Sequence, residues 1–362
     1  MQSRVLIPAL ILLLTYASAS AQDPAPSSKE GSVSTRYSLA LIDDATFYSG
    51  TPAQAPHILN QVLLEPTFGI RYKNRLTFST SPIGLSSTYD HTASTFHVKE
   101  TYIGLSAGDF DITAGRKMVR WGTGYAFSAA GVLDPPRVPT NPSDRLNTNQ
   151  GRDMIKADWV HGPHALTLAW SSSALAPAHS TLRDTTAFRY NVLVRGFDTS
   201  LIAGKDRGGD SFGALTFTRV VGQAWELHGE AVWREQAAAL IGAKCTLHSG
   251  VTFIGEFYKP PNTAYFRNMS VSPLAGRQHY ALLNAGKSRL RELPGWKEWD
   301  ASASIVTNLD DRSFVGVTDI SRWLGTRFST YVHLEIPHGN STSDFGSARF
   351  QTATSVGVRF HL

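Results

Sequence analysis

Residues 350–362 read FQTATSVGVRFHL, and this segment decides the fold class. One face of an extended chain would hold Phe350, Thr352, Thr354, Val356, Val358, Phe360 and Leu362. The other face would hold Gln351, Ala353, Ser355, Gly357, Arg359 and His361. Strict alternation of this kind is typical of a β-strand between an apolar and a polar environment.

The same alternation recurs along the chain, for example at residues 188–195, 225–234 and 327–336. These segments run for about 10–12 residues, which suits a tilted strand crossing a bilayer. Strands of soluble sandwiches are usually shorter, about 5–6 residues. We find about 18 such segments, although 14 or 16 also fit because strand boundaries are hard to place. The pattern predicts an all-β protein that forms a closed antiparallel transmembrane β-barrel.

The connections between segments alternate in length, as they do in outer-membrane barrels with a periplasmic N-terminus. Short turns occur at residues 73–74, 161–163 and 222–223, and longer links at residues 122–151 and 260–276. The link at residues 286–296 is long for a periplasmic turn. Two links expected outside, near Glu235 and Asp310, are short. The alternation therefore supports the barrel in most places.

The first 21 residues have the composition of a secretory signal peptide. Arg4 precedes an apolar run over residues 5–14, and Ala19-Ser20-Ala21 offers a cleavage site before Gln22. We expect residues 1–21 to be the signal peptide, residues 22–34 a short periplasmic segment and residues 35–362 the barrel.

The composition argues against a nucleic-acid-binding protein and against a fold held by disulfides. Charged residues make up 17% of the chain and the net charge is +5, so no concentrated basic arm for nucleic acid is expected. Cys245 is the single cysteine, so the fold has no internal disulfide. The alternation places Cys245 with Ala243 and Leu247 on the lipid-facing side.

Residues 122–151 form the longest predicted loop, the third external one. Its four prolines disfavour both strand and helix. In trimeric porins the third loop folds into the lumen and narrows it, and this loop resembles that arrangement in position and size. The alternative is a loop that only caps the barrel outside. The candidate constriction residues are Asp134, Arg137, Asp144 and Arg145.

The residues before this loop resemble a pattern of several outer-membrane barrel families, with alginate-export barrels as looser relatives. A strand ends in Gly115-Arg116 and then Trp121-Gly122, and Asp-Pro and Asn-Pro pairs follow at residues 134–135 and 141–142. Lys117 stands where these families usually have Gln, and Leu362 where many barrels end in Phe. The resemblance implies an outer-membrane location and a C-terminal strand recognised by the barrel-assembly machinery.

Catalytic and nucleotide motifs are weak. Gly104–Gly108 fits Gly-x-Ser-x-Gly but lies on a hairpin rather than a strand–turn–helix. Residues 281–288 fit a relaxed phosphate loop within a strand. His161 and His164 flank a turn without metal-binding partners. An outer-membrane hydrolase using a histidine such as His333 is the enzyme alternative, but we expect no enzyme, cofactor or metal.

A barrel of 16–18 strands leaves a water-filled lumen unless something plugs it. Strand parity places these residues along the channel: Arg36, Arg71, Arg189, Arg195, Glu226, His228, Glu230, Lys244, Arg327, Glu335 and Arg359. Basic residues outnumber acidic ones, which favours small polar solutes with a mild anion preference. The alternatives are a dedicated polysaccharide or carboxylate transport barrel and a filled structural barrel. The sequence does not choose between a monomer and a homo-oligomer.

Overall fold

The computed structural model describes residues 33–50, 57–87, 94–135, 137–141, 146–174, 184–207, 209, 211–234, 236–260, 279–290 and 296–362. The expected signal peptide, residues 1–21, lies outside the described residues. So do residues 22–32 of the expected periplasmic segment and two candidate constriction residues, Asp144 and Arg145.

The described residues form eighteen strands. They are β1 (Val33–Ser49), β2 (Ile58–Tyr72), β3 (Leu76–Ser87), β4 (Thr95–Ala107), β5 (Phe110–Lys117), β6 (Arg152–His161), β7 (His164–Ser172), β8 (Thr185–Val194), β9 (Phe197–Asp206), β10 (Ser211–Val221), β11 (Trp225–Trp233), β12 (Ala237–Thr246), β13 (Thr252–Lys259), β14 (Tyr280–Lys287), β15 (Trp299–Asn308), β16 (Phe314–Leu324), β17 (Phe328–His338) and β18 (Thr352–His361).

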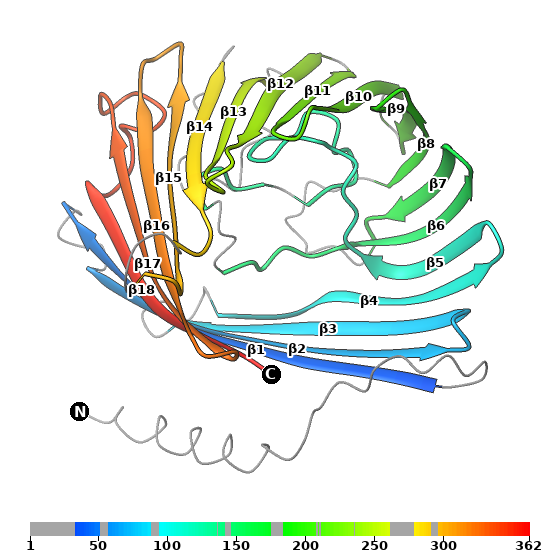
Figure 1. Ribbon diagram of the computed structural model, residues 1–362, viewed down its shortest axis with the longest axis horizontal. Coiled ribbons are helices and arrows are strands. Elements are labelled where there is room, and N and C mark those ends of the chain that lie inside the picture. Colours follow the sequence, from blue (N-terminus) through cyan, green and yellow to red (C-terminus); the bar gives the residue numbers. More distant parts are fainter. Residues whose placement is uncertain are drawn as a thin grey trace.

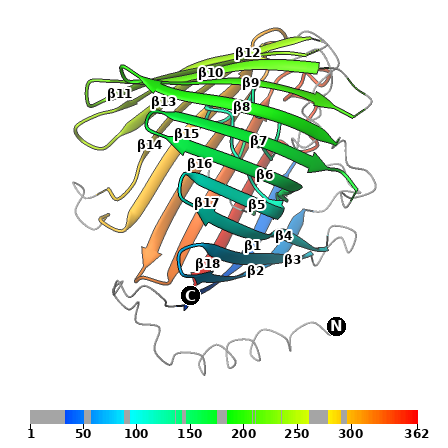
Figure 2. The same cartoon turned by 90° about the vertical axis from the view of Figure 1, so that its right-hand side faces the viewer.

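Each strand pairs antiparallel with its neighbours in the chain, and β1 also pairs with β18. The closing register runs from Ala40 opposite His361 to Ser49 opposite Thr352. Figure 1 looks into the resulting ring, and Figure 2 shows the strands tilted across its wall. Closure gives each of the eighteen described strands a partner on both sides, which a sheet needs in an apolar medium. The predicted antiparallel barrel of 18 strands is confirmed.

Tight turns join the strands at one end of the barrel. Lys73 and Asn74 have φ angles of 48° and 53°, and Arg195 and Gly196 have 50° and 79°. Positive φ at both positions matches the right-handed twist of the flanking strands. Arg195, which parity assigned to the channel lining, therefore lies in a turn.

The start of the last strand differs from the prediction. Phe350 was expected on its outward face, but β18 begins at Thr352. The residues before it turn into the barrel, where Phe345 is fully buried and the main-chain N–H of Phe345 donates to Ser313 Oγ. These contacts replace strand pairing over that segment.

The two faces of the wall differ as predicted. On β11, Trp225 and Trp233 are exposed on the outer face, whereas His228 and Glu230 are 0% and 3% exposed on the inner face. The inner face is less uniformly polar than predicted. Buried apolar residues of β7–β16 form a cluster inside the barrel with loop residues such as Trp121, Phe127 and Leu133.

No helix in the described part of the chain is long and apolar enough to cross a membrane.

Candidate functional site

The connection between β5 and β6, residues 118–151 (the β5–β6 loop), enters the barrel. In Figure 1 it crosses from the end of β5 towards β10–β13. Phe127 stacks on Tyr258 of β13 with ring centroids 5.1 Å apart, and its ring centroid lies 6.2 Å from that of Tyr280 on β14, which pairs with Tyr258. This loop therefore packs on the inner wall, and the alternative of an outside cap is wrong for its described part.

Glu230 of β11 holds the loop by its main chain. Its carboxylate accepts N–H groups from Thr123 and, at 2.7 Å, from Gly124 through Oε1. Oε2 accepts the N–H groups of Ala129 at 2.6 Å and Ala130 at 2.7 Å. A loop with no regular structure cannot pair these amides itself, so the buried carboxylate supplies the missing acceptors.

Glu256 of β13 holds the middle of the same segment. It accepts N–H groups from Tyr125, from Ala126 at 2.9 Å and from Phe127 at 3.2 Å. His228 Nε2 lies 3.0 Å from Glu256 Oε1, and both side chains are fully buried. The histidine therefore orients the carboxylate towards the loop. His228 Nδ1 has no hydrogen-bond partner among the described residues.

A glycine makes room for the histidine. A Cβ on Gly242 of β12 would lie 2.3 Å from His228 Nε2 and 2.9 Å from the main-chain oxygen of Gly255. Such a contact forces one of them to move. β12 therefore needs a residue without a side chain at position 242, opposite His228.

Asp134 braces the loop internally. It accepts the N–H groups of Trp121 at 2.6 Å and Gly122 at 3.1 Å, and it lies 3.8 Å from the guanidinium of Arg137. Arg137 also donates to the main-chain oxygen of Gly122 at 3.1 Å. Burial raises the pKa of Asp134, against the lowering effect of these partners. The two described candidate constriction residues thus lie together and shape the loop.

Tyr125 connects the loop to two predicted lining residues. Its hydroxyl donates to Glu226 Oε1 at 2.8 Å and accepts from Lys244 Nζ at 3.1 Å. The ammonium group also lies 5.1 Å from the centre of the tyrosine ring. Desolvation and the hydrogen bond to Glu226 raise the pKa of Tyr125, which keeps the hydroxyl protonated.

The returning part of the loop lies against the opposite wall. Leu146 packs on a second inner cluster that includes Ile42 and Leu63 of β1 and β2. His97 Nε2 of β4 lies 3.0 Å from the main-chain oxygen of Thr148, and the N–H of Gly151 donates to the oxygen of Lys99 at 2.9 Å. The described parts of the loop therefore contact two different parts of the inner wall.

Basic side chains gather on the inner face of β5–β8. Lys117 and Arg152 face each other in the register of β5 and β6. Lys156 pairs with Asp158 two positions along β6, and Arg189 Nε of β8 donates to Ser200 Oγ at 3.0 Å. Only Arg189 was among the predicted lining residues, although the parity of β6 carries the information for Arg152 and Lys156.

The remaining predicted lining residues do not form one cluster, and not all of them are on the inner surface. Arg36 and Arg71 lie near one end of β1 and β2, and Arg327 lies in the turn before β17. Glu335 is buried on β17, and the guanidinium of Arg359 on β18 lies 5.9 Å from the ring of Tyr331. Among the described residues no group of three or more His, Cys, Asp or Glu side chains could hold a metal ion.

No protein-family model and no curated protein matches the chain. Solved structures do. A triple-mutant Rhodopseudomonas blastica porin matches with a TM-score of 0.52 at 9% identity, over 91% of this chain and 100% of the porin. Pseudomonas aeruginosa OpdK, solved with vanillate, gives a TM-score of 0.64 at 9% identity, over 91% and 98%. OpdQ of the same organism gives 0.61 at 10%, over 91% and 98%. At these identities the likeness shows the porin-type barrel fold alone.

Proposed function

We propose that this protein is an outer-membrane channel for small polar solutes, with the β5–β6 loop as its constriction. The observation that carries the proposal is the binding of seven loop amides by Glu230 and Glu256 inside an 18-stranded barrel. A barrel of this size is too wide for its wall residues to fill. A loop held across the lumen therefore sets the width of the water path.

The outer-membrane location is supported by the outer face of the wall. Side chains such as Leu283, Ile241 and Trp233 are more than half exposed there. An apolar band around a closed barrel with a polar inside is the signature of transmembrane barrels. We further propose that residues 1–21 are removed on export and that the C-terminal strand serves the barrel-assembly machinery. Mass spectrometry of the mature protein tests the cleavage before Gln22.

We propose small anions, carboxylates above all, as the preferred solutes. The basic side chains on the inner face of β5–β8 support this preference because they raise the local concentration of anions in a narrow lumen. The vanillate bound to OpdK makes an aromatic carboxylate a sensible test solute. The hydrolase alternative finds less support, since His228 and His333 are 0% and 2% exposed and out of reach of a substrate.

The test is conductance in a planar lipid bilayer, with the reversal potential measured across a KCl gradient. We expect discrete channels and a reversal potential whose sign reports chloride selectivity. Liposome swelling with vanillate and with a neutral sugar of similar size then tests the solute class. Absence of channels would refute the channel, whereas channels selective for cations would refute only the preference.

A further inference from the structure

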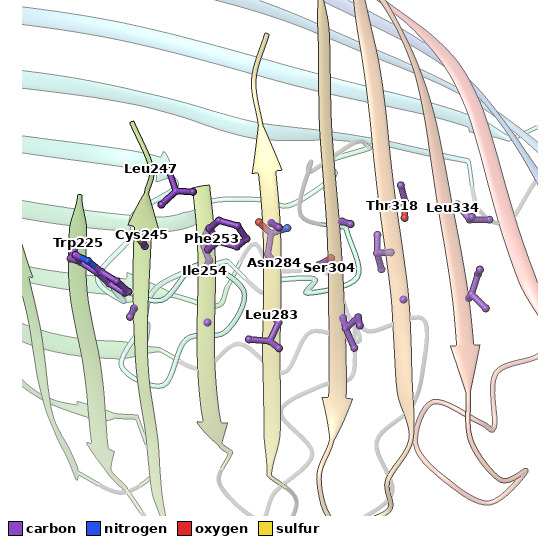
Figure 3. A pocket seen from close by; sticks show the side chains of 18 residues that line it. Trp225, Cys245, Leu247, Phe253, Ile254, Leu283, Asn284, Ser304, Thr318 and Leu334 are labelled. Atoms are coloured by element: carbon purple, nitrogen blue, oxygen red, sulfur yellow. The ribbon is translucent and has the colours of Figure 1, made fainter. Parts of the chain in front are cut away.

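The outer wall of the barrel is hollowed across β11–β17. The groove has a volume of about 850 Å³. Figure 3 shows side chains that line it, among them Trp225, Leu283 and Leu334. Five small residues on the outward positions of adjacent strands leave this part of the wall thin: Ala243, Gly255, Ala285, Ala303 and Gly316. The missing side-chain volume produces the groove.

Large apolar side chains border these small residues. Phe253, Leu283 and Ile305 stand on the same outward faces and are about half exposed or more. Thr318 brings a hydroxyl to the lining, and Cys245 lies beside Trp225 at one end. A long depression with a mostly apolar lining in a lipid-facing wall suits a hydrocarbon chain better than a polar solute.

Basic and aromatic residues lie beyond one end of the groove. Lys287 follows Ala285 by two residues on the outward side of β14, about 7 Å further along the strand. On β16, the guanidinium of Arg322 lies 5.4 Å from the centre of the Trp299 ring. Tryptophans and snorkelling cations at a strand end mark the level of lipid headgroups. Glu298 is exposed beside Trp299 in the chain, but Lys287 and Arg322 leave the cluster with a net positive charge, which favours an anion.

We propose that the groove binds an acyl chain of an anionic phospholipid, whose phosphate lies near Lys287 and Arg322. The end that carries these cations faces the periplasm in the orientation predicted above, so the lipid belongs to the inner leaflet. The inference rests on the proposed outer-membrane location. It does not depend on conduction, since the groove is on the opposite side of the wall from the lumen.

The test uses phosphatidylglycerol with a photoreactive diazirine in its acyl chain, reconstituted with the full-length protein. Crosslinked peptides are mapped by mass spectrometry. The filling variants are Gly255→Leu and Gly316→Leu, because a Cβ at these positions meets no atom closer than 3.6 Å and 4.0 Å. The matched control is Gly213→Leu on β10, where a Cβ meets its nearest atom at 3.9 Å, outside the groove.

We expect crosslinks concentrated on β12–β16, and a drop of about tenfold in the double filling variant. That drop corresponds to two methylene groups no longer buried. The Gly213→Leu control should keep the wild-type pattern. Lys287→Gln should lower the preference for phosphatidylglycerol over phosphatidylcholine about fivefold, as expected for one lysine at a membrane surface. Lys205→Gln, on the outer face of β9, should leave it unchanged.

Crosslinks spread evenly around the barrel would overturn the inference, as would filling variants that label like wild type. A disulfide between the Cys245 residues of two copies, formed by mild oxidation, would also overturn the inference, because a second chain would then cover the groove. Channel recordings on the same samples keep the two proposals apart. A silent but locally labelled protein refutes the channel, and a conducting but evenly labelled one refutes the lipid site.

Discussion

Replacing Glu230 by alanine should release the β5–β6 loop and widen the channel. The substitution removes the acceptor of four loop amides at once. Counted singly, hydrogen bonds to a charged group contribute about 1.5–3 kcal/mol each. The sum overstates the loss, because released amides regain water in the lumen and Glu256 still holds its own three.

A more realistic magnitude is about 3–5 kcal/mol, the range for removing one partner from a buried charged network. This lowers the ratio of docked to released loop by two to four powers of ten. Since the strands keep their own pairing, the barrel itself should persist. We expect a larger single-channel conductance with more current noise, and the double variant Glu230→Ala/Glu256→Ala should show the largest effect.

The assay is planar-bilayer recording, with heat-modifiable electrophoretic mobility as the check on barrel integrity. Asp198→Ala is the matched control, because this carboxylate of β9 accepts a hydrogen bond from Asn191 of β8 and has no described contact with the loop. If the Glu230 variant keeps an intact barrel and conducts like the Asp198 control, the loop does not border the water path. That result would refute the constriction.

Three further outcomes are expected. Gly242→Val should displace His228 and cost about 1–3 kcal/mol of stability through overpacking, with extra current noise, measured by urea titration and bilayer recording. Burial raises the pKa of Asp344 above its ordinary value of 3.8. The protonated carboxyl of Asp344 therefore stabilises the fold fully below pH 3.8, and this stabilisation is lost as the pH rises through the raised pKa. The unfolding free energy should fall over that pH range in the wild type, and Asp344→Asn should abolish the fall. Arg189→Glu should shift the reversal potential towards cation selectivity, and an unchanged potential would place the ion path elsewhere.

The strands could be predicted closely from the sequence because side-chain parity reports two different environments. Ile58, Phe110 and Arg152 begin β2, β5 and β6 as expected. The ends of strands were less secure. Arg195 and Arg327 continue a parity pattern into turns, where alternation no longer decides which way a side chain points.

The role of the inner glutamates could not be predicted, although parity placed Glu226 and Glu230 on the correct face. Parity tells which side of the wall a residue is on, but not what covers it. The partners of Glu230 are main-chain amides about 100 residues earlier in the chain, and every residue type except proline has such an amide. The apolar residues on the inner face of β7–β16 were not predicted either, because parity does not tell that loop residues such as Phe127 cover them.

Because the β5–β6 loop is held by its main-chain amides, its conformation depends little on which side chains it carries. Glu230 and Glu256 bind main-chain groups that most side-chain replacements in the loop leave in place, so the side chains of the proposed constriction can change while the path of the loop is kept. Lineages that share these contacts could diverge in solute choice through a few substitutions in one short segment. The loop sequence could likewise be exchanged by design, provided that Glu230, Glu256 and Gly242 are kept.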